Sequence, residues 1–207
     1  NLPKSLEEVA GNDWECVMTI PENQWGYHRD WSLSYIKTPF DLIEMMVQAN
    51  ALNGNLVINF GPDGEGNIRQ EETTIAREIG NWMQVNGEAV YGAGNSKLEK
   101  QDWGYITQRD GDIYLIVFNK PINNLVRVKL PRAKNSKEKV MVIDKAIFLI
   151  DEKPARIKEG LRDKSGSDYY NIVIPESLQK QTMPFVIKIN LKEISHGDKE
   201  AYQQALT

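Results

Sequence analysis

The sequence has a single cysteine, only two histidines and no long apolar run, and each shortage excludes a class of protein. Cys16 alone cannot form a disulfide within the chain or a multi-cysteine metal site. His28 and His196 lie far apart, so a histidine-rich metal centre has no support. The glycine-rich stretch 61–67 lacks the Lys-Ser/Thr ending of a phosphate-binding loop. We therefore expect no cofactor, and we expect no membrane span because no apolar stretch approaches about 18 residues.

Positive charge is not concentrated in the sequence: the net charge is −4, the sequence pI is about 5.4 and no dense stripe of Lys or Arg occurs. Binding to a polyanion requires concentrated positive charge, so we predict no nucleic-acid partner. The content of 41% apolar and 26% charged residues is typical of a globular protein with a buried core. At 207 residues the chain has room for one large or two ordinary domains.

The first part of the chain has the residue pattern of an α/β protein. Residues 14–20 predict a short strand that Pro21 ends. Residues 38–54 predict a helix that begins at Thr38-Pro39 and closes at Asn53-Gly54. Residues 55–60 form a short β-branched apolar run, and residues 70–85 predict a second helix. Helix, strand and helix in this order indicate a (β/α) barrel or an open α/β sheet.

The length of this part decides how much of a barrel it contains. A complete (β/α)8 barrel needs roughly 250 residues, whereas residues 1–93 contain at most two strands. The run 55–60 is typical of a strand buried on both faces, which needs neighbours in hydrogen-bonding register. We therefore predict that this part of the chain is the tail end of a larger sheet. Its other strands would be encoded before Asn1, where the sequence begins without Met.

The second part, residues 94–207, predicts an all-β domain. Asp110-Gly111 predicts a hairpin turn, and residues 112–118 are apolar on both faces, which indicates a central strand. Many short antiparallel strands in about 100 residues favour a C-terminal antiparallel β-sandwich. The six strand candidates are residues 103–108, 112–118, 125–130, 139–150, 168–174 and 185–191.

Two features of residues 14–37 point to a sugar-binding or sugar-cleaving site. Glu15 directly follows Trp14, and a carboxyl group beside an indole suits proton transfer next to a sugar ring. Trp25 opens a Trp-Gly-Tyr turn in a predicted loop, residues 22–37, which also carries Tyr27, Trp31 and Tyr35. The alternative for these aromatic residues is a loop that packs over a core.

Four motifs in order resemble the α-L-fucosidases of glycoside hydrolase family 29. They are Trp14-Glu15, Trp25-Gly26-Tyr27, the stretch 54–64 (Gly-Asn-Leu-Val-Ile-Asn-Phe-Gly-Pro-Asp-Gly) and the stretch 79–91, which ends in Asn-Gly-Glu-Ala-Val-Tyr. The spacing is kept throughout residues 14–91. Gln24 stands where the family often has serine. The resemblance implies that residues 1–93 are the last segments of a (β/α) barrel catalytic domain. Residues 95–207 carry no sharp signature, and the resemblance implies that residues 94–207 form a β-sandwich domain.

The resemblance implies a retaining hydrolase that removes terminal α-L-fucose from fucosylated glycans. It assigns Glu15 as the catalytic acid/base, and the alternative is an ion-pair partner in the barrel wall. It places Trp25 in the substrate site, near the C6 methyl group of the sugar, and the alternative is a loop anchor. The nucleophilic aspartate and the histidines that hold the sugar lie upstream in the family, so this chain alone is predicted to be inactive.

Another class of function also fits the sequence, namely a non-catalytic carbohydrate-binding or scaffolding module in which the sandwich is the working part. It would need an exposed aromatic platform, for which the candidates are Trp103, Tyr105, Tyr169 and Tyr170. A further alternative is a family member that keeps the barrel but has lost catalysis. By resemblance, the parent protein is expected to be periplasmic, secreted or lysosomal.

Overall fold

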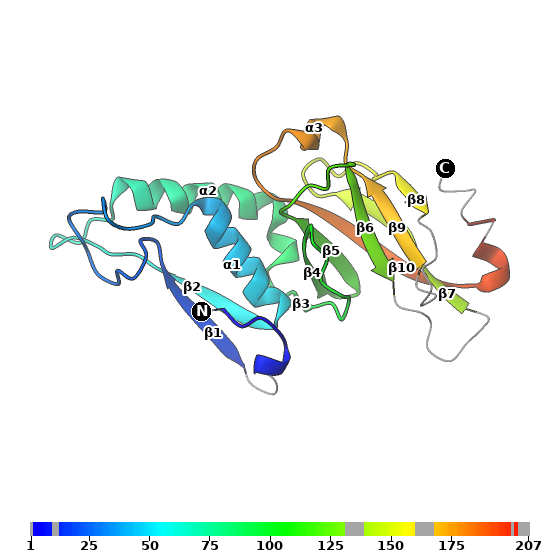
Figure 1. Ribbon diagram of the computed structural model, residues 1–207, viewed down its shortest axis with the longest axis horizontal. Helices are drawn as coiled ribbons and strands as arrows, with labels where there is room; N and C mark the ends of the chain where they lie inside the picture. Colours follow the sequence, from blue (N-terminus) through cyan, green and yellow to red (C-terminus); the bar gives the residue numbers. More distant parts are fainter. Residues whose placement is uncertain (1, 10–12, 131–138, 160–167, 200, 203–207) are drawn as a thin grey trace. The chain divides into compact units, whose positions relative to one another are not determined.

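The computed structural model describes residues 2–9, 13–130, 139–159, 168–199 and 201–202, and it divides into two compact units. Unit 1 comprises Asn1–Gly94 and unit 2 comprises Asn95–Thr207. Figure 1 shows helices and strands in the first unit and mostly strands in the second.

Unit 1 is built on two parallel strands, β1 (Trp14–Thr19) and β2 (Gly54–Asn59), which follow the short 3-10 helix η1 (Glu7–Val9). Trp14 pairs with Gly54 in the register. A Cβ atom on Gly54 would lie 2.1 Å from the Trp14 indole, so only glycine leaves room for the ring. The indole Nε1 donates a hydrogen bond to the Leu52 carbonyl oxygen at 3.0 Å. The predicted strands are confirmed, and the Trp14 side chain packs β1 against the start of β2.

Helix α1 (Pro39–Ala51) begins where the sequence predicts, because Thr38 is its N-cap. Thr38 Oγ1 accepts from the Asp41 backbone N–H, and the Asp41 carboxylate accepts from the Thr38 N–H at 2.7 Å. Such a capping box satisfies two otherwise unpaired donors. The helix ends at Ala51, and Asn53 has a φ of 59°, so the chain turns there and enters β2 at Gly54.

Helix α2 (Gln70–Asn86) follows β2 and continues into the 3-10 helix η2 (Gly87–Ala89). Its Trp82 is 5% exposed, and α1 packs against both β2 and α2. The predicted second helix is therefore confirmed, one residue longer than expected. The core of this unit comes mainly from α1, through fully buried Leu42, Ile43, Val47 and Ala49.

One expectation for unit 1 is wrong for the chain as it stands. The run 55–60 was expected to be buried on both faces, but Val57 is 41% exposed, and Val17 beside it on β1 is 39% exposed. Leu56 and Ile58, on the opposite face, are half-buried. Within the described part of the chain, β1 and β2 pair only with each other and close no barrel. One face of the pair therefore remains uncovered.

Unit 2 consists of two antiparallel sheets. The five-stranded sheet has the order β3-β4-β5-β10-β7, and the three-stranded sheet has the order β6-β9-β8. A short helix, α3 (Glu176–Gln179), and a 3-10 helix, η3 (His196–Asp198), follow β9 and β10. The strands are β3 (Gly94–Asn95), β4 (Gly104–Arg109), β5 (Asp112–Val117), β6 (Leu125–Leu130), β7 (Lys139–Phe148), β8 (Ile157–Glu159), β9 (Asp168–Val173) and β10 (Phe185–Ser195).

The two sheets share one core and so form a β-sandwich, as predicted. Leu115 and Ile187 from one sheet and Val128 and Ile172 from the other are fully buried in it. All six predicted strands are present, and β5 is central in its sheet. The predicted hairpin turn is confirmed, because Asp110 and Gly111 both have positive φ, of 51° and 91°. Sequence analysis missed the short strands β3 and β8.

Within the described residues, every helix is too short or too polar to cross a membrane.

Candidate active site at the C-terminal edge of the parallel strands

Two loops meet the C-terminal ends of β1 and β2, which is the edge where parallel α/β sheets carry their functional residues. The first connects β1 to α1 and includes the aromatic loop, defined here as residues 22–37. The second connects β2 to α2 and comprises residues 60–69. Both loops belong to unit 1.

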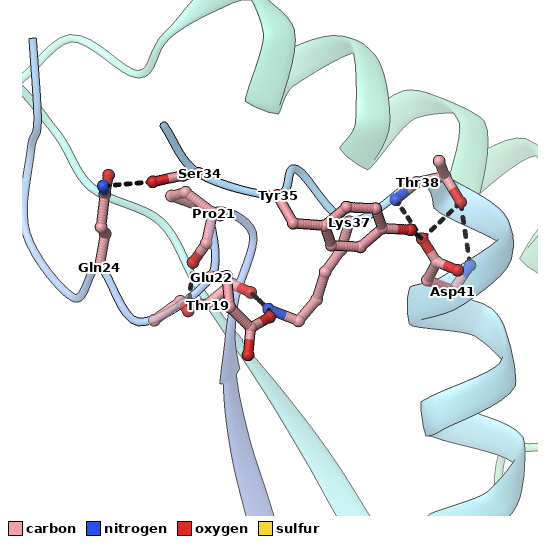
Figure 2. A network of polar contacts seen from close by, with 9 residues as sticks. All are labelled: Thr19, Pro21, Glu22, Gln24, Ser34, Tyr35, Lys37, Thr38 and Asp41. Atoms are coloured by element: carbon pink, nitrogen blue, oxygen red, sulfur yellow. Dashed lines mark hydrogen bonds and ion pairs between the residues drawn. The ribbon is translucent and has the colours of Figure 1, made fainter. Parts of the chain in front are cut away.

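The base of the aromatic loop is closed by backbone pairing. Pro21 and Ile36 form an antiparallel bridge, and the Glu22 N–H donates to the Tyr35 carbonyl oxygen at 2.8 Å. One step further along, Gln24 Nε2 donates to Ser34 Oγ at 2.5 Å (Figure 2). The predicted loop therefore returns on itself, and its two arms run together before they reach α1.

A buried lysine anchors this base to β1. Lys37 is 4% exposed, and its Nζ lies 2.8 Å from Glu22 Oε2 and donates to the Thr19 carbonyl oxygen at 2.9 Å. Figure 2 shows the Lys37 side chain reaching from the end of the loop back toward the end of β1. Because a buried ammonium requires such partners, the pair with Glu22 fixes the loop base to the strand end.

A shared carboxylate joins the aromatic loop to α1. Tyr35 Oη donates to Asp41 Oδ2 at 2.7 Å, beside the bonds from Thr38 (Figure 2). Burial alone would raise the pKa of Asp41, but the hydrogen bonds from Tyr35 and Thr38 outweigh it and lower that pKa. The bond to Asp41 in turn raises the pKa of the Tyr35 hydroxyl.

The far end of the aromatic loop rests on the second loop. Asn59 Nδ2 donates to the Trp25 carbonyl oxygen at 2.7 Å. A Cβ atom on Gly61 would lie 2.9 Å from the backbone of Gly26, so the two chains touch there directly. Arg69, the residue before α2, donates to the His28 carbonyl oxygen at 2.6 Å.

A buried carboxyl group lies beneath this contact. Glu72, in the first turn of α2, is 1% exposed, and its Oε1 accepts from the Gly61 N–H at 3.4 Å. Its Oε2 has no hydrogen-bond partner within the described part of the chain. Burial raises the pKa of the Glu72 carboxyl. Glu72 thus holds the backbone of Gly61 through this hydrogen bond, and its side chain is shielded from solvent.

The structure does not bring the two predicted site residues together. Trp25 is 58% exposed and lies on the C-terminal side of β1, with its neighbour Tyr27 also exposed. Glu15 is the second residue of β1, is exposed and pairs with Asn55. It precedes Thr19 by four residues, which corresponds to about 13 Å along the strand. Glu15 therefore lies toward the opposite end of the strand from the aromatic loop.

Sequence reasoning missed the residues that hold the aromatic loop, namely Asn59, Gly61 and Arg69. The available signal was the position of Asn59 and Gly61 directly after a predicted parallel strand, where functional loops begin. His28 is exposed, and its Nδ1 is hydrogen-bonded with the Asp30 carbonyl oxygen at 2.7 Å. Across the described ranges no cluster of His, Cys, Asp and Glu could hold a metal ion.

The aromatic candidates in unit 2 do not form an exposed platform. Trp103, Tyr105 and Tyr170 are at most 7% exposed, and only Tyr169 among the four is half-buried. Trp103 Nε1 donates to the Arg127 carbonyl oxygen at 2.8 Å, which suits a core residue that satisfies its polar atom. This packing favours a structural role for these residues.

Sequence comparison shows that the chain is similar to α-L-fucosidases. Residues 3–88 match the family model described as "Alpha-L-fucosidase". The chain is 29% identical over 145 residues to the tissue alpha-L-fucosidase of Rattus norvegicus, and the match covers 68% of this chain and 30% of the relative. It is 31% identical over 137 residues to the tissue alpha-L-fucosidase of Homo sapiens, and that match covers 62% and 28%. The chain thus spans about 30% of the length of these curated relatives.

Solved structures show the same relationship over both units. The chain superposes on a GH29 alpha-L-fucosidase from Bacteroides thetaiotaomicron with a TM-score of 0.81 and 40% identity. The match covers 93% of this chain and 41% of that one. That structure is a covalent intermediate trapped with 2-fluoro-fucosyl fluoride in a variant in which a glutamate is replaced by glutamine.

Proposed function

We propose that this chain, whose residues 3–88 match the α-L-fucosidase family model, is the C-terminal portion of a retaining α-L-fucosidase. Residues 1–93 would be the last segments of its (β/α)8 barrel, and residues 94–207 its β-sandwich. The observation that carries the proposal is the 40%-identical match, which covers 93% of this chain but 41% of the fucosidase. The uncovered face of β1 and β2 supports it, because further strands and the barrel interior would cover Val17 and Val57.

The proposed reaction removes terminal α-L-fucose from a glycan by double displacement. One carboxylate attacks the anomeric carbon and expels the aglycone, whose oxygen takes a proton from a second carboxyl group. That second group then accepts a proton from the water that hydrolyses the covalent intermediate, and the two carboxyl groups lie about 5–5.5 Å apart. The trapped intermediate of the Bacteroides enzyme supports this scheme. We assign the nucleophile to a barrel segment upstream of these 207 residues.

Glu15 remains our proposal for the acid/base group, because the resemblance selects it. Its place near the N-terminal end of β1 favours the other interpretation, in which Glu15 is a carboxylate of the barrel wall. Both interpretations place Glu15 on the same face of the pair as Val17 and Val57.

Trp25 is our proposal for the residue that contacts the sugar, with its indole against the C6 methyl group. Its exposure at the C-terminal edge of β1 supports this role, since a loop anchor would be expected to bury its ring. An apolar ring face accepts the methyl group of fucose better than the hydroxymethyl group of the corresponding hexose. Trp25 would then set substrate specificity.

Trp25→Ala in the intact enzyme is expected to lower kcat/KM for an aryl α-L-fucoside by roughly 10- to 100-fold, because a lost apolar contact of this size costs about that factor. The melting temperature should barely change, since the indole is 58% exposed. Leu33→Ala is the matched control, because Leu33 lies in the same loop and is 97% exposed. Equal rates for the two variants would show that Trp25 does not contact the substrate.

The proposed function is tested by assaying the isolated 207-residue chain and the intact parent protein with an aryl α-L-fucoside. We expect the intact protein to turn the substrate over and the isolated chain to give no rate above buffer, because the nucleophile is missing. Circular dichroism should first show that the isolated chain retains its strands. Turnover by the isolated chain would contradict our placement of the nucleophile, and an inactive parent would contradict the proposed activity.

We also propose that the parent protein works outside the cytoplasm, in the periplasm, in a lysosome or after secretion, where fucosylated glycans are available. The relatives that support this include a plasma alpha-L-fucosidase of Homo sapiens, 30% identical over 125 residues.

A further inference from the structure

Part of the aromatic loop is exposed, and contacts to the second loop hold it in place. All six residues from Trp25 to Asp30 are exposed. Their position therefore depends on a few contacts to the second loop and not on burial of their side chains. The contacts come from Asn59, Gly61 and Arg69. Asn59 ends β2, Gly61 follows two residues later, and Arg69 directly precedes α2.

The end of β2 fixes the backbone of Trp25 itself. Asn59, the last residue of β2, donates from Nδ2 to the Trp25 carbonyl oxygen at 2.7 Å. Two residues on, Gly61 touches Gly26 so closely that a side chain there would meet the Gly26 carbonyl at 2.9 Å. These contacts tie Trp25 to the end of β2, which is paired along its whole length with β1.

Arg69 fixes the segment that follows. Its guanidinium carbon lies 4.3 Å from the centre of the Trp31 ring and 5.3 Å from the centre of the Tyr27 ring. Its Nη2 also donates to the carbonyl oxygen of His28 at 2.6 Å. A planar guanidinium stacks on aromatic rings and donates in its own plane at the same time, which a lysine ammonium does not.

We propose that Arg69 is a positioning residue, which clamps residues 27–31 to the start of α2 and thereby sets Trp25 at the distance that accepts a methyl-bearing sugar. Asn59 and Gly61 complete the clamp from the end of β2. The inference rests on the proposed function, because it assigns the clamp to the fucose site. Arg69 touches no reacting atom and acts only through the aromatic loop.

The test compares three variants of the intact enzyme: Arg69→Ala, Arg69→Lys and Arg77→Ala. Arg77 lies about two turns further along α2 and is exposed, so its loss controls for removal of one positive charge from this helix. The readout is the preference for an aryl α-L-fucoside over the α-L-galactoside, which carries a hydroxymethyl group in place of the methyl group. Preference, unlike total activity, is insensitive to the fraction of unfolded protein.

Arg69→Ala is expected to reduce this preference roughly tenfold, mainly through KM for the fucoside, because displacing the indole weakens a single apolar contact. Arg69→Lys should recover little of it, since lysine keeps the charge but lacks the planar donors. Arg77→Ala should match the wild type. An unchanged preference in Arg69→Ala, or full recovery by lysine, would overturn the proposal.

A second pair of variants tests the clamp at Gly61. Gly61→Ala would press a methyl group into the Gly26 backbone, whereas a methyl group on Gly64, in the same second loop, meets nothing within 4 Å. Gly61→Ala is therefore expected to reduce the sugar preference as Arg69→Ala does, and Gly64→Ala to leave it unchanged. The same loss in both glycine variants would contradict the contact.

Trypsin cleavage after Arg29 separates failure of the clamp from failure of the proposed function. Arg29 lies in the clamped segment and is exposed. Arg69→Ala should increase the cleavage rate after Arg29 at least severalfold, and Arg77→Ala should not. If the wild-type enzyme hydrolyses no fucoside, the proposed function fails, and the cleavage rates still decide whether Arg69 holds the loop. Unchanged cleavage would overturn the clamp whatever the activity.

Discussion

If Glu15 is the acid/base group, Glu15→Gln in the intact enzyme is expected to lower kcat for fucoside hydrolysis by roughly 10²- to 10⁴-fold. Glutamine keeps the shape of the side chain but can neither donate a proton to the aglycone nor accept one from water. The loss should be larger for a glycoside with a basic leaving group, such as a methyl or sugar aglycone, than for a nitrophenyl fucoside. The measurement is steady-state kinetics with both substrates.

Azide distinguishes an acid/base role from a structural one. When the general base is missing, the covalent intermediate forms from an activated substrate but reacts slowly with water. Azide attacks the anomeric carbon without base assistance, so it should restore turnover of the nitrophenyl substrate and yield fucosyl azide. A variant that is damaged only in its structure gains nothing from azide.

The position of Glu15 defines the outcome that would contradict this proposal. A carboxylate of the barrel wall near the N-terminal end of β1 would lie well below the aromatic loop, about 13 Å from Thr19 along the strand. Its replacement would then change kcat little, show no dependence on the leaving group and lack rescue by azide. That result would assign the acid/base role to a residue other than Glu15. The proposed roles of Trp25 and Arg69 would be unaffected.

Local chemistry made most of the fold predictable from the sequence. Thr38-Pro39 identified the start of α1 because its capping groups lie next to one another in the chain. Asp110-Gly111 identified the β4–β5 hairpin because both residues tolerate a positive φ. The short strand β8 escaped prediction because its three residues carry too little pattern, and its pairing with β9 depends on distant residues.

The environment of β2 was less predictable, for a different reason. An apolar β-branched run shows that a strand is suited to burial on both faces. It does not show whether this chain contains the elements that pack against both faces. Likewise, the clamp on the aromatic loop joins Arg69 to His28, 41 residues apart, through a backbone carbonyl that no side-chain pattern marks. Glu15 and Trp25 could each be selected from the sequence as candidate site residues. That they lie toward opposite ends of β1 could be established only from the structure.

Gly104→Ala is expected to destabilise the β-sandwich by about 3–5 kcal/mol, more than the roughly 1–3 kcal/mol usual for overpacking, because the new methyl group has no space. Gly104 opens β4 opposite the end of β5, and its Cβ would lie 2.0 Å from the Ile116 carbonyl oxygen and 3.2 Å from the Phe118 nitrogen. Both are backbone atoms, so no rotamer change relieves the contact. Relief requires separation of the strands where Phe118 N–H bonds to the Trp103 carbonyl oxygen at 2.9 Å.

Gly111→Ala, in the turn of the same hairpin, is the matched control. Gly111 has a φ of 91°, so alanine is strained there, but nothing lies within 4 Å of its Cβ position. We expect it to cost about 1–2 kcal/mol, the usual penalty for a left-handed L-residue. Thermal unfolding of the intact protein should therefore separate the two variants by several degrees. Because every proposed site residue lies in unit 1, folded Gly104→Ala protein should keep the wild-type KM for the fucoside, and equal losses of stability in both variants would show that space at Gly104 is not limiting.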